Sequence, residues 1–385
     1  MKKYVEDEKK IEAQKKNQPK IKSIGLILFA TIIGFALGYF ILVLVPNDVG
    51  NSGFYLAPIL LLIFFVCYML QIFMHEIGHL IFGLLTGYSF VSFRVGQLTL
   101  IKKDGQFKFT QINLPGTGGQ CLMDPPPYND GNFPFLLYNL GGIMINLVLA
   151  AIFLLLPNES FPFLLNAFFV SFGLAGILAE ITNALPIKIS GIPTDGYNIQ
   201  AIRKNETVKH AFWLQLKGNA LLSEGAEPKD LPIEELNLKN QEELLNPLVT
   251  STQLFRYNYY LDQMDFEKAQ ESLDVLTPYI DELIPVYQNE VKLEWMFLEL
   301  IGENRPEIIN SLFDDSFSQY IQSTANWLNR KRFFMAYEWF HNQNANKAME
   351  NYQQLNELVA IHPNTGEATM EMGLGNWLKD QIEHK

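Results

Sequence analysis

The sequence predicts a multi-pass α-helical membrane protein with about four transmembrane helices, a β-hairpin after the second of them, and a soluble α-helical repeat domain at the C-terminal end. Three observations support this fold class. The first half of the chain contains long apolar runs with nearly balanced charge. The part after residue 200 holds most of the acidic residues and accounts for essentially all of the net charge of −12. Three stretches in that part also resemble one another.

Four segments are each long enough to cross a bilayer, which requires roughly 20 apolar residues. They are residues 24–45, 54–85, 133–156 and 161–185. The second exceeds the length of a single untilted span. We therefore expect either a strong tilt or a protrusion of its last turns toward one membrane surface.

Basic residues predict the orientation of these spans. Residues 1–23 are rich in lysine, and the loop at 88–132 carries Arg94 and Lys108, whereas the short connections at 46–53 and 157–160 carry no Lys or Arg. The positive-inside rule therefore places both termini and the long loop in the cytoplasm. The compact plan of spans favours a prokaryotic plasma membrane over an organelle.

The long loop contains the signature of a β-hairpin. Apolar and polar residues alternate on either side of Lys103-Asp104-Gly105, which is a turn signal. The next stretch, "GTGGQCLMDPPP", is rich in glycine and proline, so we expect no regular structure there. Beside a membrane site, a hairpin of this kind can lie on the surface or dip into the protein interior, and the sequence does not decide between them.

Charge and cysteine content argue against a nucleic-acid-binding protein and against a disulfide-stabilised fold. Outside the first 22 residues no basic patch is large enough to neutralise a phosphate backbone, which argues against a nucleic-acid partner. The two cysteines, Cys67 and Cys121, define no disulfide framework. Cys67 is interpreted as a small buried hydrophobe, and Cys121 as an ordinary buried thiol rather than a metal ligand.

The stretch "QIFMHEIGHLIFG" places ionisable residues within the second predicted span. Such residues are costly in a membrane unless they serve a function. His75 and His79 lie one helical turn apart on the same face, so both imidazoles can bind one Zn²⁺, with Glu76 beside the metal as general base. The pattern predicts a zinc site at this position.

A catalytic zinc usually has three protein ligands, and two residues are candidates for the third. Glu180, in "GILAEITNALP", is a carboxylate within the fourth span. Asp195, in "SGIPTDGYN", lies just past that span on a turn bounded by Pro and Gly that can fold back. The residues by themselves leave this choice open.

Three motifs together resemble the site-2 protease family of intramembrane zinc metalloproteases. They are "HEIGH" in the second span, "NLGGIMINL" in the third and "NALPIKISGIPTDG" at the end of the fourth. Members of that family pair an HExxH helix with a later motif of Asn, Pro and Asp-Gly. The resemblance covers residues 54–198, the three-helix catalytic core. In this chain the stretch between the motif asparagine and aspartate is longer than is common in the family.

The resemblance implies a zinc metalloendopeptidase with one Zn²⁺ per chain, which cuts a membrane-embedded protein or a remnant signal peptide. It implies that His75, His79 and Asp195 bind the metal and that Glu76 activates water. Asn183 then falls where the family has its motif asparagine near the substrate. The segment Arg94-Val95-Gly96 is similar to the membrane-associated β-hairpin that follows the HExxH helix in relatives.

Small and polar residues in the third span have two interpretations. Gly141 and Gly142 permit close packing of helices, and Asn146 can form an interhelical hydrogen bond. The alternative is that Asn146 supports the site or binds the extended backbone of a substrate. The sequence does not choose between them.

The sequence divides into four parts: a basic cytoplasmic segment at 1–23, a membrane-embedded metalloprotease domain at 24–199, a partly helical linker at 200–248 and a helical repeat domain at 249–385. In the last part, Ala269, Ile308 and Ala348 recur within similar stretches at spacings of 39 and 40 residues. Helix-turn-helix units at this spacing are typical of a tetratricopeptide-like solenoid, which commonly binds a peptide or protein. A cytoplasmic protein or peptide is therefore a predicted partner, beside the membrane substrate and the lipid bilayer.

A second class of function competes with the protease. The alternative is a non-catalytic membrane scaffold or chaperone of the same fold, acting through its helical repeats. The intact His75, Glu76 and His79 argue against it, because a non-catalytic chain is free to lose the glutamate. A transporter would show inverted repeats or more spans, and neither is visible.

Overall fold

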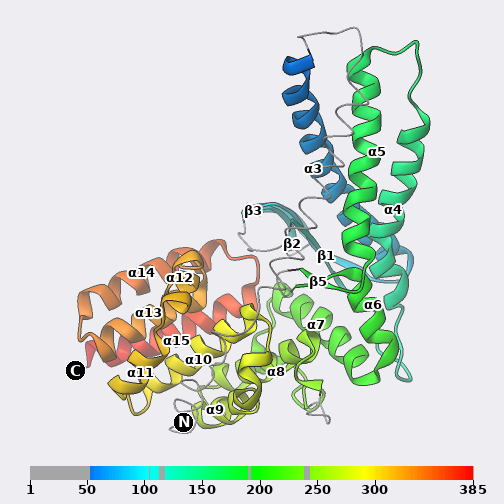
Figure 1. The fold of residues 1–385 in the computed structure, drawn as a ribbon. Coiled ribbons are helices and arrows are strands. Elements are labelled where there is room, and N and C mark those ends of the chain that lie inside the picture. Colours follow the sequence, from blue (N-terminus) through cyan, green and yellow to red (C-terminus); the bar gives the residue numbers. More distant parts are fainter. Residues whose placement is uncertain (1–52, 104, 112–117, 190–191, 238–242, 385) are drawn as a thin grey trace, which may run out of the picture. The chain divides into compact units, whose positions relative to one another are not determined.

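The computed structural model describes residues 53–103, 105–111, 118–189, 192–237 and 243–384 (Figure 1). It is mostly helical, at 70%, with a small antiparallel sheet. Among the described residues, three helices are long and apolar enough to cross a membrane. The predicted class of a helical membrane protein is confirmed to this extent. The basic segment at 1–23 and the span predicted at 24–45 lie outside the described residues.

The three candidate spans match the predicted ones within a few residues at each end. They are α3 (Gly53–Leu85), α4 (Phe135–Leu155) and α5 (Phe163–Ala184). At 33 residues α3 is about 50 Å long, well above the roughly 30 Å of a hydrocarbon core. Large apolar side chains stay exposed on all three helices, such as Leu155 at 85%, and such surfaces suit lipid.

The described residues form two compact units, and the boundary between them passes through all three candidate spans. The first unit holds the residues up to Gln71 together with Leu149–Ile177. Within it, the amide of Gln71 donates to the Phe172 carbonyl at 2.9 Å, and the rings of Phe153 and Phe172 lie 4.3 Å apart. A polar residue in this apolar unit is thus paired with a backbone acceptor.

The second unit holds Ile72–Val148 and Leu178–Lys385, and in it α3 and α4 approach very closely. A Cβ atom at Gly78 would overlap the carbonyl group of Gly141, and one at Gly141 would overlap that of Gly78. Only glycine permits this contact, which is the usual role of small residues between membrane helices. The contact brings the HExxH turn of α3 against α4.

The loop between α3 and α4 folds into a four-stranded antiparallel sheet of order β3-β2-β1-β4. Its strands are β1 (Ser89–Val95), β2 (Leu98–Lys103), β3 (Gln106–Gln111) and β4 (Gly119–Asp124). The predicted hairpin is confirmed, because Lys103 pairs with Gln106 across the turn. Gly105 has a φ of +74°, which glycine adopts without strain.

The expectation of irregular structure after the hairpin is wrong for β4. Gly119 pairs with Val95 and Cys121 pairs with Phe93, so β4 forms an edge of the sheet beside β1. The stretch is poor in strand-forming residues, and local propensity therefore argues against a strand. Pairing with a strand about 25 residues earlier in the chain supplies the backbone hydrogen bonds that the local sequence does not indicate.

After α5 the chain makes a short hairpin and enters two helices. The elements are β5 (Lys188–Ile189), β6 (Ile192–Pro193), α6 (Asp195–Lys204) and α7 (Glu206–Glu224). One face of α7 holds the segment that follows β4, through side chains spaced four residues apart. Lys217 Nζ lies 2.9 Å from Asp124 Oδ1, and the Trp213 indole donates to the Pro126 carbonyl at 2.9 Å. Lys209 Nζ donates to the Gly131 carbonyl at 3.3 Å.

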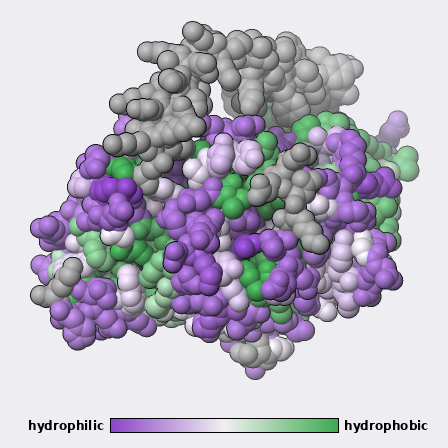
Figure 2. All heavy atoms as spheres, turned by 90° about the horizontal axis from the view of Figure 1, so that it is seen from below, coloured by the Kyte–Doolittle hydropathy of each residue, from purple (hydrophilic) through white to green (hydrophobic). Residues whose placement is uncertain are grey.

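The rest of the chain is helical. The helices are α8 (Pro247–Asp262), α9 (Phe266–Asp274), α10 (Pro285–Ile301), α11 (Pro306–Leu312), α12 (Asp315–Ser323), α13 (Leu328–Ala336), α14 (Ala345–Ile361) and α15 (Thr365–Glu383). Shorter helical turns lie at Pro228–Asp230, Thr277–Glu282 and Tyr337–His341. Figure 2 shows hydrophilic residues over most of the described surface on the face that it draws.

The three similar stretches each fold as helix, turn and helix. Each turn contains a non-glycine residue with positive φ: Met264, Asn304 and Gln343. Five positions after each of these stands a fully buried residue: Ala269, Ile309 and Ala348. In the second stretch the fully buried residue is Ile309, whereas the predicted Ile308 is only half-buried. The solenoid itself stays a prediction.

A buried charge network lies within these helices. The Arg332 guanidinium donates to Glu294 at 2.7 Å and to Glu371 at 2.7 Å, and it stacks over the Phe297 ring at 4.0 Å. The Tyr257 hydroxyl donates to Glu294 at 2.7 Å. Both carboxylates and the arginine are almost inaccessible to solvent. The network therefore ties α8, α10, α13 and α15 together.

We predict that Arg332→Met destabilises the helical part by about 3–5 kcal/mol, because two buried carboxylates lose their cation. All five tryptophans lie at or after position 213, so denaturant unfolding followed by tryptophan fluorescence reports on this part of the chain. The matched control is Lys379→Met, since Lys379 makes a partly exposed pair with Glu383 at 3.5 Å. The control is expected to change stability by less than about 0.5 kcal/mol. Equal effects of the two variants would contradict the prediction.

Candidate metal centre

The two histidines of the HExxH motif lie on one face of α3. His75 and His79 are four residues apart, which places their side chains one above the other on a helix. Both are buried, and their Nε2 atoms lie 3.1 Å apart. The two imidazoles therefore present ligand nitrogens to a common point.

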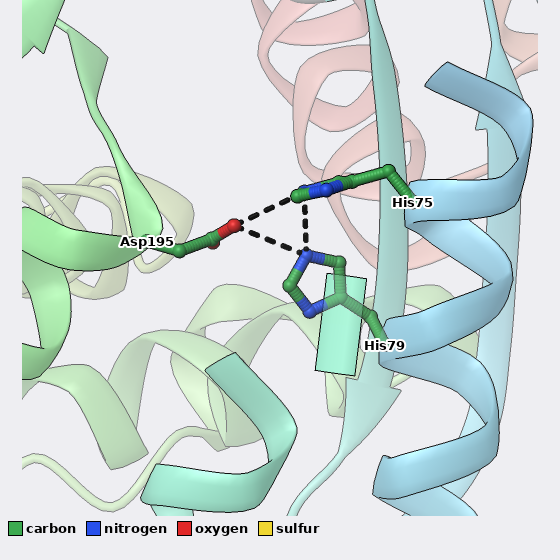
Figure 3. Close-up of side chains that lie close together, drawn as sticks. All are labelled: His75, His79 and Asp195. Carbon is green, nitrogen blue, oxygen red and sulfur yellow. Dashed lines mark hydrogen bonds and ion pairs between the residues drawn. The ribbon is translucent and has the colours of Figure 1, made fainter. Parts of the chain in front are cut away.

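Asp195 meets the histidines at that point, although it lies 116 positions beyond His79 in the chain. Its Oδ2 is 3.0 Å from His75 Nε2 and 3.4 Å from His79 Nε2 (Figure 3). The candidate ligand atoms of the three residues all lie within 4.8 Å of one another. The structure thus brings together a group that can hold a metal ion, as the resemblance implied.

The short hairpin of β5 and β6 explains how the chain delivers Asp195 to this position. The hairpin turns the chain back on itself between Asn183 and Asp195. Thr194 caps the start of α6, and its hydroxyl donates to the Leu185 carbonyl at 2.6 Å. A Cβ at Gly196 would overlap the carbonyl group of Ala184, so glycine lets this turn pack against the end of α5.

The outer nitrogen of each histidine contacts an acceptor. His79 Nδ1 lies 2.7 Å from the backbone carbonyl of Tyr138, and His75 Nδ1 lies 3.2 Å from Glu180 Oε1. A carbonyl only accepts, so the Nδ1 of His79 carries a proton and donates it to Tyr138. This second contact is the usual arrangement for a metal-binding histidine.

These contacts separate the two candidates for the third ligand. The group that can hold a metal contains Asp195 and does not contain Glu180. Asp195 lies on the Nε2 side of the imidazoles, whereas Glu180 contacts the opposite nitrogen of His75. The geometry therefore favours Asp195 as the ligand and gives Glu180 a different position.

The charge state of Asp195 suits a ligand. Burial by itself raises the pKa of this carboxyl group. The charge of His79 and hydrogen bonds from both histidines outweigh burial and hold the pKa below its ordinary value. Asp195 consequently remains ionised at neutral pH.

Glu76 lies beside strand β4, and its side chain is buried. A Cβ at Gly119 would stand 2.5 Å from Glu76 Oε1, so the carboxylate fills the space where glycine lacks a side chain. The buried guanidinium of Arg94 interacts electrostatically with Glu76 and donates to the Gly119 carbonyl at 3.3 Å. A cation thus accompanies the candidate general base.

The remaining predicted residues are not part of the metal group. Asn146 is fully buried within α4, which suits either interpretation of it. Asn183 is half-buried near the end of α5, and no hydrogen bond among the described residues joins it to the histidines or Asp195. Cys121 is buried in β4, where burial and the charge of Glu76 raise the pKa of its thiol. That shift disfavours the thiolate and agrees with an ordinary buried thiol.

Sequence reasoning missed three contributors to the site. Tyr138 supplies the carbonyl for His79, and its hydroxyl donates to the Cys121 carbonyl at 2.8 Å. Gly119 makes room for Glu76, and Gly142 makes room for the ring of His75, because a Cβ there would lie 2.5 Å from His75 Nδ1. The adjacent Gly141 and Gly142 in the sequence indicate a close approach to α4, whereas nothing in the sequence indicates a role for Tyr138.

The donor set fits a divalent metal. Two imidazoles and one carboxylate are a combination that Zn²⁺ accepts, and three protein ligands are typical of catalytic rather than structural zinc. No family model, curated protein or solved structure matches this chain. The chemistry of the site therefore rests on its own residues.

We predict that Gly142→Ala weakens zinc binding at least about tenfold, because the added methyl displaces the ring of His75. Gly119→Ala is expected to move Glu76 and to leave zinc affinity near the wild-type value. Competition with a chromophoric chelator measures both affinities on detergent-purified protein.

The control for these two variants is Gly118→Ala. Its nearest neighbour is the flexible end of Ile72 at 3.2 Å, which can move aside. Zinc affinity of Gly142→Ala equal to that of Gly118→Ala would refute the placement of His75 against α4.

Proposed function

We propose that this chain is a zinc metalloendopeptidase that hydrolyses a peptide bond of a membrane-embedded protein or of a remnant signal peptide. One observation carries the proposal. His75, His79 and Asp195 converge on a point, with Glu76 adjacent in sequence, and three of these four residues belong to a helix long and apolar enough to cross a membrane. A hydrolytic site on such a helix suits a substrate that is itself in the membrane.

The resemblance to the site-2 protease family supports the same conclusion. It rests on "HEIGH", "NLGGIMINL" and "NALPIKISGIPTDG". The hairpin of β5 and β6 accommodates the longer spacing of the last motif, so that departure does not count against the comparison. The additional span predicted at 24–45, the cytoplasmic termini and the plasma membrane location belong to the same proposal.

His75, His79 and Asp195 would hold the metal, and zinc is the metal that this donor set and the HExxH spacing favour. When bound, Zn²⁺ supplies Lewis acidity and lowers the pKa of a coordinated water from 15.7 to about 7. The outer-nitrogen contacts of both histidines keep their Nε2 atoms directed at this point.

Glu76 would act as the general base and then as the general acid. Its carboxylate accepts a proton from the attacking water and delivers it to the leaving amide nitrogen. Arg94 and the backbone of Gly119 limit where the carboxylate can go. The substrate has to arrive locally unwound, because a peptide bond within a helix is shielded by its own hydrogen bonds.

The helical segment after residue 249 would recruit a protein or peptide from the cytoplasm. Helix α7 packs against α8, the first helix of this segment. Its Lys217 and Trp213 contact Asp124 and Pro126 at the end of β4, the strand next to Glu76, and so connect the segment to the site. We predict that Lys217→Met lowers reporter cleavage several-fold and leaves zinc content unchanged. Cleavage at the wild-type rate would argue against this connection.

Zinc content and cleavage of a generic membrane-helix reporter test the main proposal together. Wild-type protein is expected to hold zinc and to cleave. Glu76→Gln retains zinc and loses about a hundredfold or more of its activity, since the proton transfer is lost. Asp195→Ala loses zinc. Glu159→Gln, in the exposed loop between α4 and α5, is the matched control and behaves as wild type.

Two results would direct the interpretation elsewhere. Zinc retained in Asp195→Ala would make Glu180 the ligand to test. Wild-type protein without zinc and without cleavage would favour the non-catalytic scaffold, which acts through the helical part of the chain.

A further inference from the structure

Glu180 is the feature of this site that the proposed mechanism does not use. It lies in α5, a candidate membrane span, and is only 2% exposed. Its Oε1 is 3.2 Å from His75 Nδ1, while its Oε2 is buried and has no hydrogen-bond partner among the described residues. A carboxylate in such surroundings costs several kcal/mol unless positive charge lies nearby.

We propose that Glu180 is a positioning residue for the metal: it accepts the Nδ1 proton of His75, directs Nε2 toward the metal point, and supplies a negative charge that balances the bound cation. This inference rests on the proposed metal-binding function. It assigns to Glu180 a role distinct from direct ligation, which the geometry gives to Asp195.

The two histidines differ in the chemical group that contacts their Nδ1 atoms. Tyr138 offers His79 a neutral carbonyl at 2.7 Å, whereas Glu180 offers His75 a carboxylate. A carboxylate makes the imidazole a stronger electron donor than a carbonyl does, and loss of such a partner typically weakens metal binding 10- to 100-fold. His75 is therefore the histidine whose affinity for metal depends on a charged neighbour.

Charge balance provides the second argument. Asp195 by itself would leave a dication with one excess positive charge in a region of low dielectric constant. Glu180 supplies the second negative charge, while Arg94 interacts with Glu76 and offsets that carboxylate. With the metal bound, the formal charges of these buried groups cancel, and this accounts for an otherwise costly carboxylate in α5.

Glu180→Gln separates charge from shape. The glutamine oxygen still accepts from Nδ1 of His75, but the negative charge is gone. We expect zinc affinity about tenfold weaker in Glu180→Gln and at least as weak in Glu180→Ala. Thr182→Val is the matched control two positions away, where the hydroxyl donates only to the Ala179 carbonyl of the same helix. It is expected to bind zinc as wild type does.

Chelator competition on the detergent-purified full chain measures these affinities, and thermal unfolding of the metal-free protein is the second readout. A positioning role predicts that Glu180→Gln leaves the unfolding temperature of the metal-free protein unchanged or raises it. A lowered temperature would make the carboxylate a structural partner of His75 and overturn the inference. Zinc affinity within twofold of wild type in both variants would overturn it as well.

These outcomes are distinct from failure of the proposed function. If wild-type protein binds no zinc, both the function and this inference fall together. If wild-type protein binds zinc and cleaves the reporter, while the Glu180 variants bind zinc equally well, only the role of Glu180 is refuted.

Discussion

Polar groups within helices apolar enough to cross a membrane need partners inside the protein, because lipid offers none. The candidate site follows from this constraint. Each histidine has an acceptor on its outer nitrogen and a shared carboxylate, Asp195, on its inner nitrogen. Gln71, one turn before His75, is paired with a backbone carbonyl in the same way. The polar residues of α3 are therefore held in fixed orientations by the residues around them.

Glycines make those contacts possible. Gly78 and Gly141 let the backbones of α3 and α4 touch, so His79 reaches the Tyr138 carbonyl on α4. Gly142 admits the ring of His75, and Gly119 admits the carboxylate of Glu76. A side chain at any of these positions would occupy space that a functional group needs. The geometry of the site therefore depends on these glycines as well as on the candidate ligands.

Segments outside the spans complete the arrangement. The hairpin of β5 and β6 turns the chain after α5, and α6 then begins at Asp195. Strand β4 packs against Glu76 at Gly119. Three side chains of α7 contact the last residue of β4 and the segment that follows this strand. The buried network around Arg332 joins four helices of the C-terminal part. Helix α7 and the strand beside Glu76 are linked through short polar contacts.

The sequence by itself determined what depends on local periodicity and spacing. The three described spans, the hairpin turn at Gly105 and the shared face of His75 and His79 all follow from residues close together in the chain. It did not indicate strand β4 or the burial of Ile309 in place of Ile308, because these depend on pairing and packing by distant segments. It also left Glu180 and Asp195 as equal candidates by geometry. Only the tertiary structure placed them on opposite nitrogens of His75, since their positions are decided by how α5 and the following hairpin fold back on α3.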